Sequence, residues 1–188
     1  MSRVSQATAV KNRADAVTAA ARLFRERGVQ QVSIADVMKS VGLTVGGFYK
    51  QFESKEALVA EATTRAFEER NAYLTELSQA HPDAPTARRA LLDAYLSPTH
   101  RDDPGSGCAC AGLAADIAKT DETCVSREAY ADGVREFADW LSDTDREDGL
   151  VMTATLVGAI LMARATAGTD LSEDIMRAAR HSVEARLP

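Results

Sequence analysis

Hydrophobic positions recur every three or four residues along most of the chain, which is the spacing of amphipathic helices. No segment alternates apolar and polar residues at the two-residue period of a half-buried strand. The prolines stand between the periodic segments or at the end of the chain and interrupt none of them. The pattern therefore predicts an all-α chain of about nine helices.

The expected helices have approximate bounds. One N-terminal helix covers residues 11–27, and two short helices lie between residues 33 and 52 on either side of a glycine turn. The longer helices that follow are expected at 55–79, 86–97, 108–119, 122–141, 145–167 and 172–187. A polar segment rich in Pro and Gly, residues 98–107, is expected to be a connection without helix.

The segment 33–52 carries the start and stop signals of two helices. Ser33 is a good N-cap, and Asp36 three residues later favours the same positive helix end. Gly42 supplies the left-handed residue that ends the first helix, and Thr44 caps the second. Two short helices joined in this way indicate a helix-turn-helix.

The second of these helices has a bare face. Gly46 and Gly47 each cost roughly 1 kcal/mol relative to alanine, so packing by Phe48 and Phe52 must hold the helix as core. Glycine also lets the backbone approach another surface closely, which suits DNA. The neighbouring side chains offer the hydroxyl, amide and cationic groups that contact phosphates and base edges, and they are Thr44, Tyr49, Lys50, Gln51 and Lys55.

Charge is distributed unevenly along the chain. The formal net charge is −6, which is the wrong sign for a protein that binds nucleic acid. Residues 1–56, however, contain nine Lys and Arg against five Asp and Glu, a net charge of +4, so the remainder carries −10. The basic part is the part that bears the helix-turn-helix, which favours DNA binding there.

The stretch SIADVMKSVGLTVGGFYKQFESKEALV resembles the DNA-binding region of the TetR family of bacterial transcriptional regulators, and the likeness covers residues 10–62. It implies a helix-turn-helix domain over 1–53 and a helical effector-binding and dimerisation domain over 54–188. By resemblance, Thr44, Val45 and Gly47 touch bases or their backbone, while Tyr49 and Lys55 touch phosphates. The full set expected to bind DNA is Ser33, Thr44, Val45, Gly46, Gly47, Tyr49, Lys50, Gln51 and Lys55, and Arg3 is expected to reach a phosphate as an arm.

The last two expected helices, 145–167 and 172–187, carry more apolar surface than one chain can cover. We expect them to pair with their copies in a second subunit, as they do in the resembled family; the alternative is packing within one chain. A dimer places two recognition helices about 34–36 Å apart, the spacing of successive major grooves in a palindromic operator. No run approaches the ~18–20 uninterrupted apolar residues of a membrane helix, so we expect a cytoplasmic protein with no membrane partner.

Cys108 and Cys110 begin the expected helix 108–119, where aligned amides lower the pKa of a thiol. The segment YLSPTHRDDPGSGCACAGLAADIAK also resembles a TetR subgroup with Gly-Cys-Pro before a similar helix, some members of which sense reactive species through that cysteine. Here alanine and a second cysteine replace the proline and its neighbour. Three readings stay open: plain packing, a thiol sensor at Cys108 or Cys110, and a metal site if His100 and Cys124 come close.

A small apolar effector is the other expected switch. The cavity that would hold it is expected among helices four to eight, with a wall formed by Phe67, Tyr95, Cys108, Leu113, Phe137, Trp140, Met152 and Leu156. The uninterrupted helix 55–79 runs from the DNA-binding part into the acidic part and is the expected lever between them. Either switch would make the protein a homodimeric repressor that leaves its operator when an unknown small molecule binds or a cysteine is modified.

Two other classes of protein compete with this reading. A thiol enzyme would use Cys108 as nucleophile and His100 as base, but no orienting Asp or Asn and no oxyanion device is identifiable in the sequence. A protein-interaction module that has lost DNA binding is the second competitor. We expect a regulator and not an enzyme, with no cofactor and no metal.

Overall fold

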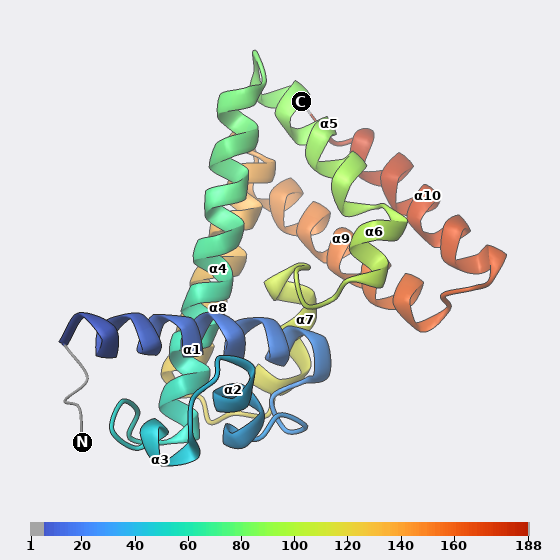
Figure 1. The fold of residues 1–188 in the computed structure, drawn as a ribbon. Coiled ribbons are helices and arrows are strands. Elements are labelled where there is room, and N and C mark those ends of the chain that lie inside the picture. Colours follow the sequence, from blue (N-terminus) through green and yellow to red (C-terminus); the bar gives the residue numbers. More distant parts are fainter. Residues whose placement is uncertain (1–5, 188) are drawn as a thin grey trace.

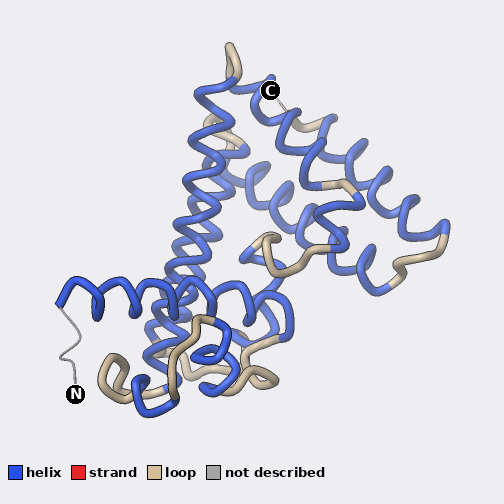
Figure 2. The backbone as a smooth tube through the Cα atoms, viewed as in Figure 1, coloured by secondary structure: helices blue, strands red, loops and turns tan. Residues whose placement is uncertain are grey.

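The computed structural model describes residues 6–187, and every regular element in that range is a helix (Figures 1 and 2). The predicted all-α class is therefore confirmed. Arg3, expected to act as a phosphate-contacting arm, lies outside the described residues. The helices are α1 (Gln6–Arg27), α2 (Ile34–Ser40), α3 (Val45–Phe48), α4 (Lys55–Ala80), α5 (Ala84–Tyr95), α6 (Pro98–Asp102), α7 (Ala109–Ile117), α8 (Val125–Leu141), α9 (Arg146–Ala165) and α10 (Asp170–Glu184).

The long helix α4 is the axis of the molecule (Figure 1). At one end α1 crosses it, with α2 and α3 packed beside this crossing. α8 lies along α4, and α9 packs between α8 and α10. α7 contacts α1, α4, α8 and α9, so it joins the N-terminal helices to the rest of the molecule.

The ends of α2 form as the sequence predicts. The Ser33 hydroxyl accepts a hydrogen bond from the Asp36 amide at 3.1 Å, and the Ser33 amide donates to the Asp36 carboxylate at 2.9 Å, which completes a capping box. Gly42 follows the helix with φ at +72°, the left-handed conformation expected of it. Thr44 stands at the N-cap of α3 but makes no side-chain capping bond, so its hydroxyl is not used there.

Phe48 and Phe52 form the core of the helix-turn-helix, as predicted. Their side chains are 0% and 3% exposed, and their rings stack with centroids 5.1 Å apart. The glycine-rich helix α3 has only four residues, so this aromatic packing and not local propensity fixes its position.

The expectation that residues 98–107 contain no helix is wrong. Ser97 accepts a hydrogen bond from the His100 amide at 3.2 Å, and Pro98 occupies the first position of α6. Proline is favoured at this position because its missing N–H would have no partner there. The Ser97-Pro98 pair therefore starts a helix and does not break one.

α9 is, in the described part of the chain, the one helix with the length and composition of a membrane span, with a mean hydropathy of 1.4 over an 18-residue window. Charged residues stand near both of its ends, including Arg146 and Arg164. The interior helix of a water-soluble protein has the same composition, so this is weak evidence for a membrane.

Candidate DNA-binding surface and effector cavity

The helix-turn-helix presents a polar, partly bare surface around α3. Val45 is 43% exposed and Tyr49 66% exposed, and Thr44 and Lys50 are exposed beside them. A Cβ added at Gly46 would meet no atom within 4 Å, so the backbone there is open to an approaching surface. These five residues share one accessible surface of the DNA-binding part.

The other four expected DNA-binding residues are less free. Gly47 is half-buried over the Met38 side chain, and Gln51 is half-buried with no partner for its side-chain oxygen. Ser33 is exposed, but its hydroxyl serves the α2 cap. Lys55 donates to the Val29 carbonyl at 2.7 Å, a tie within the chain that the sequence reading did not foresee.

α1 braces this unit against α4 through Arg13. Its guanidinium makes a bidentate ion pair with Glu61 and lies over the Phe52 ring, 4.7 Å from the centroid. The pair raises the pKa of Arg13, chiefly through the hydrogen bonds to Glu61. The recognition unit is thus held to the first turns of α4.

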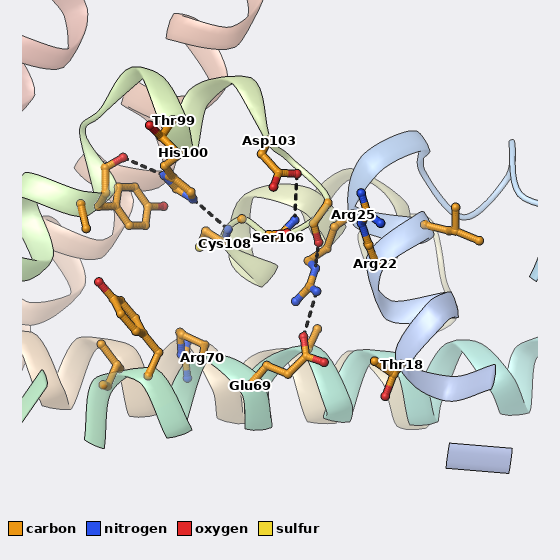
Figure 3. A pocket seen from close by; sticks show the side chains of 18 of the residues that line it. Thr18, Arg22, Arg25, Glu69, Arg70, Thr99, His100, Asp103, Ser106 and Cys108 are labelled. Carbon is orange, nitrogen blue, oxygen red and sulfur yellow. Dashed lines mark hydrogen bonds and ion pairs between the residues drawn. The ribbon is translucent and has the colours of Figure 1, made fainter. Parts of the chain in front are cut away.

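A cavity of about 1150 Å³ lies between α1, α4, α5 and the segment from α6 to α7 (Figure 3). Of the residues expected to line an effector pocket, Tyr95, Cys108 and Phe137 do so. Its wall also includes Thr18, Arg22 and Arg25 of α1, which places the cavity nearer the DNA-binding helices than expected. The other five residues of the expected wall do not line it, and these are Phe67, Leu113, Trp140, Met152 and Leu156.

Those five residues have other places. Leu113, Met152 and Leu156 are fully buried core, and the Phe67 ring packs edge-on against Tyr130 at 5.6 Å. The Trp140 indole donates to the Ser78 hydroxyl at 3.1 Å, away from the cavity.

Arg25 is a buried cation that links three segments. Its Nε donates to the Gly105 carbonyl at 2.9 Å, and its Nη2 donates to the Glu69 carboxylate at 2.9 Å (Figure 3). The sequence reading assigned it no role. Its position in the sequence does indicate burial. Arg25 comes four residues after Ala21 and eight after Val17, which places all three on the same buried face of α1.

Two contacts dock α7 on the end of α1. A Cβ added at Gly112 would lie 2.9 Å from the Arg25 Cβ, so only a glycine lets the helices approach this closely. The Asp116 carboxylate accepts from the Val29 amide at 2.8 Å, just beyond the C-terminus of α1. The helix that begins beside the cavity is therefore attached directly to the DNA-binding part.

Both ring nitrogens of His100 are engaged. Nε2 accepts from the Cys108 amide at 3.0 Å, so the proton must lie on Nδ1, which donates to the Tyr95 carbonyl at 2.7 Å. Burial lowers the pKa of this histidine. His100 is consequently not free to act as a base toward the Cys108 thiol, which removes the partner that a thiol enzyme would need.

Cys108 is the N-cap residue of α7, and Cys110 lies in its first turn. The two thiols influence each other, and this interaction lowers the pKa of Cys108 and raises that of Cys110. The Tyr95 hydroxyl is buried with no hydrogen-bond partner, and burial raises its pKa well above the usual value. All three groups lie at the same end of the cavity region.

The third cysteine stands apart from this pair. The Cys124 sulfur lies 3.1 Å from the Ser126 hydroxyl at the start of α8, and this bond lowers the pKa of the thiol. Residues 6–187 hold no group of three His, Cys, Asp or Glu side chains placed to bind a metal ion. The proposed metal set of His100 with the three cysteines is not assembled.

The last two helices expose apolar side chains at helical spacing. On α9, Leu150 and Leu161 are each 42% exposed and Met162 is 54% exposed, while Leu171 of α10 is 54% exposed. Gly158 lies on the same side of α9 and has no atom within 4 Å of an added Cβ. Within residues 6–187, no element covers this side of the two helices.

Sequence and structure comparisons point to one family. The model of the family described as "Bacterial regulatory proteins, tetR family" matches residues 16–62. An uncharacterized HTH-type transcriptional regulator from Mycobacterium tuberculosis is 26% identical over 186 residues, which cover 92% of this chain and 94% of the relative. This match extends well beyond the helix-turn-helix.

Two solved structures share the whole fold. A TetR-family transcriptional regulator from Agrobacterium tumefaciens has a TM-score of 0.77 at 24% identity and covers 93% of this chain and 98% of its own. E. coli NemR in its reduced form has a TM-score of 0.78 at 21% identity and covers 94% of this chain and 97% of its own. With the capping box, the glycine-bearing α3 and the aromatic core in place, residues 16–62 form the DNA-binding helix-turn-helix of the TetR family of regulatory proteins, and the chain as a whole has the fold of TetR-family transcriptional regulators.

Proposed function

We propose that the protein is a homodimeric repressor that binds a palindromic operator and is released when a small molecule occupies the cavity beside α1 or when Cys108 is modified. The observation that carries this proposal is the shared wall of the cavity. Thr18, Arg22 and Arg25 belong to α1, and Tyr95 and Cys108 belong to the effector part, yet all five line one space.

The shared wall supplies a physical route for release. Arg25 bonds both to Gly105 in the loop before α7 and to Glu69 on α4. A ligand that binds more tightly when this loop or α1 is displaced shifts the population toward that state by its differential affinity. Because coupling is reciprocal, the same ligand lowers the affinity for operator DNA by the same factor.

The apolar side of α9 and α10 supports dimerisation through these two helices, which correspond to the pair expected from the sequence. Leu150, Leu161 and Met162 recur along one side of α9, and Leu171 begins α10 beside them. A two-fold axis through this side would place the same residues against one another in a four-helix interface. A dimer would then present two copies of α3 to successive major grooves.

The DNA contacts divide by chemistry. We assign base or groove-floor contacts to Thr44, Val45 and the open backbone at Gly46, and phosphate contacts to Tyr49 and Lys50. Lys55, Gly47 and Ser33 are proposed to contribute at the margin because each already has a contact within the chain, and Gln51 is proposed to do so because it is half-buried. A protein that binds chromosomal operators in this way acts in the cytoplasm.

Selection of bound fragments from random DNA, followed by anisotropy measurements on the enriched site, tests the proposal. We expect a palindromic site bound by a dimer, with affinity that falls steeply as salt rises because counterions are released from phosphates. Compounds that raise the midpoint of thermal unfolding would then be tested for their ability to release the protein from this site.

Ala94→Trp narrows the cavity at an exposed position of its wall. It should weaken the release by ligand and leave DNA binding without ligand unchanged. An asymmetric or salt-independent site, or a ligand response unchanged by Ala94→Trp, would contradict it.

A further inference from the structure

Two thiols that differ in accessibility meet at the first turn of α7. Cys108 lines the cavity, while Cys110 is 1% exposed and does not line it. Only Ala109 separates the two residues, and each thiol shifts the pKa of the other, down at Cys108 and up at Cys110. One thiol is thus open to a small molecule in the cavity, and the second lies in the same turn outside the cavity wall.

We propose that Cys108 and Cys110 form a reversible intramolecular disulfide when hydrogen peroxide enters the cavity. The Cys108 thiolate attacks one peroxide oxygen, the O–O bond breaks, and a sulfenic acid forms at Cys108 while the other oxygen leaves as water after taking a proton. The Cys110 thiol then attacks the Cys108 sulfur, the S–O bond breaks, and a second water leaves. Two thiols are oxidised by two electrons, and one peroxide is reduced to two waters.

Chain geometry permits the bond. Two residues separated by one other have Cα atoms at most about 7 Å apart even when the chain is extended. That limit is also the largest Cα separation that a disulfide spans, about 7 Å, and the turn at the start of α7 shortens it.

The Tyr95 hydroxyl is a second, independent feature of this site. It is buried, it belongs to a residue that lines the cavity, and it has no hydrogen-bond partner. A buried hydroxyl without a partner is costly, and an oxygen atom at Cys108 would supply the missing acceptor. Tyr95 is thereby assigned as the donor to the peroxide oxygen or to the sulfenic acid oxygen.

The disulfide would act on α1 through α7. The Gly112 amide donates to the Cys108 carbonyl at 2.9 Å, the bond that closes the first turn, and Gly112 packs directly on Arg25 of α1. Drawing the two sulfurs together changes this turn and hence the docking of α1. This regulatory consequence rests on the proposed function, whereas the disulfide itself does not.

Thiol counting by mass spectrometry tests the chemistry in a Cys124→Ser protein, which keeps only the two thiols in question. After treatment with hydrogen peroxide and alkylation under denaturing conditions, we expect neither cysteine to be alkylated and the intact mass to be lower by two hydrogens. Dithiothreitol should restore alkylation of both cysteines. Cys110→Ser should instead accumulate a sulfenic acid at Cys108 that dimedone traps. Tyr95→Phe should slow the oxidation about 10-fold, the effect of one hydrogen bond made in the transition state.

Two results would overturn the disulfide. Either both cysteines can still be alkylated after the peroxide treatment, or a non-reducing gel shows a disulfide between two chains. For the regulatory step, oxidised protein should bind its selected DNA site roughly 5- to 150-fold more weakly than reduced protein. Unchanged binding after a verified disulfide refutes that step alone. If the reduced protein binds no DNA, the proposed function is refuted. The disulfide is then judged by the mass spectrometry alone.

Discussion

Gly112 of α7 and Arg25 of α1 are in direct contact, and an added Cβ at Gly112 would lie 2.9 Å from the Arg25 Cβ and 3.0 Å from its Cα. The obstructing atoms belong to the rigid stem of Arg25 and not to its flexible end. The distance between the effector part and the DNA-binding part is therefore set here by the absence of one methyl group.

Gly112→Ala should test this contact. The new methyl cannot be accommodated without moving α7 away from α1, so we expect the free energy of unfolding to fall by about 1 to 3 kcal/mol despite the better helix propensity of alanine. Ala115→Ser, an exposed position on the same helix, is the matched control and should change stability by less than about 0.5 kcal/mol. Urea denaturation of both variants measures the difference, and equal stabilities would show that the contact is not restrictive.

Arg25→Met keeps the bulk of the side chain and removes its charge. The Gly105 carbonyl and the Glu69 carboxylate then lose a donor, which should cost about 2 kcal/mol, moderated because Arg65 also contacts Glu69 at 3.2 Å. Arg27→Met, at a residue whose side chain is 52% exposed, serves as control and should be close to neutral. The midpoint of thermal unfolding reports both, and a neutral Arg25→Met would remove Arg25 as the link between α1 and the loop before α7.

Gly46→Ala separates folding from DNA binding. An added Cβ meets nothing within 4 Å, so the variant should be as stable as the parent or more stable by up to about 1 kcal/mol. If the bare backbone faces the DNA, the same methyl should weaken operator binding at least ~10-fold, the size of a lost close contact of 1.4 kcal/mol. Anisotropy titrations beside urea curves check this, and unimpaired binding would place the DNA on a different surface.

Lys50→Ala probes the assigned phosphate contact. Affinity should fall to a similar extent for the operator and for unrelated DNA, and the slope of log affinity against log salt should decrease by about 1. Tyr49→Phe, which removes one hydroxyl and no charge, should weaken binding and leave that slope unchanged. A loss confined to the operator would instead make Lys50 a residue that reads bases.

Met162→Glu places a charge on the exposed apolar side of α9. If this side is the subunit interface, a carboxylate buried there should cost about 3 kcal/mol or more and leave monomers at micromolar concentration. Val125→Glu, at a position 65% exposed at the start of α8, is the control and should leave the assembly unchanged. Sedimentation velocity gives the masses, and a Met162→Glu dimer would move the interface elsewhere.

His100 should make stability depend on pH. Burial lowers its pKa in the folded protein, so the unfolded chain binds the proton more readily, and stability is lost as pH falls from about 6.5 toward the lower folded pKa. A protonated ring would also turn Nε2 into a donor facing the Cys108 amide, and Arg164 nearby adds repulsion. The midpoint of thermal unfolding should fall with pH across this range in the parent protein and change much less in His100→Gln. His181→Gln, at an exposed position, is the control and should keep the pH dependence of the parent. A parent protein with a flat profile would contradict the assignment.

Local signals in the sequence were sufficient for the helix-turn-helix. Ser33, Asp36 and Gly42 act within a few residues of themselves, so their capping bonds and the positive φ follow from short-range chemistry. The aromatic spacing of Phe48 and Phe52 likewise predicts a shared core contact. Short-range rules are reliable where both partners lie on one helix or one turn.

The position of the cavity depends on contacts between distant residues, which no local pattern specifies. Arg25 meets Gly105 eighty residues later, and Asp116 meets Val29 across a similar separation. The expected wall was drawn from apolar side chains such as Met152 and Leu156, which fill the core instead. Apolar periodicity identifies what is buried, but whether a buried residue faces a neighbour or a space depends on how the helices cross.

The cavity wall that α1 helps to form has one more consequence. A ligand larger than the cavity can bind only if part of the wall moves outward. Arg22 and Arg25 of that wall belong to α1, the helix that braces the helix-turn-helix. Within one chemical series, small ligands should therefore bind without releasing the DNA, and larger ligands should release it more strongly. The steric size of the guest, and not its affinity alone, would set the strength of the signal.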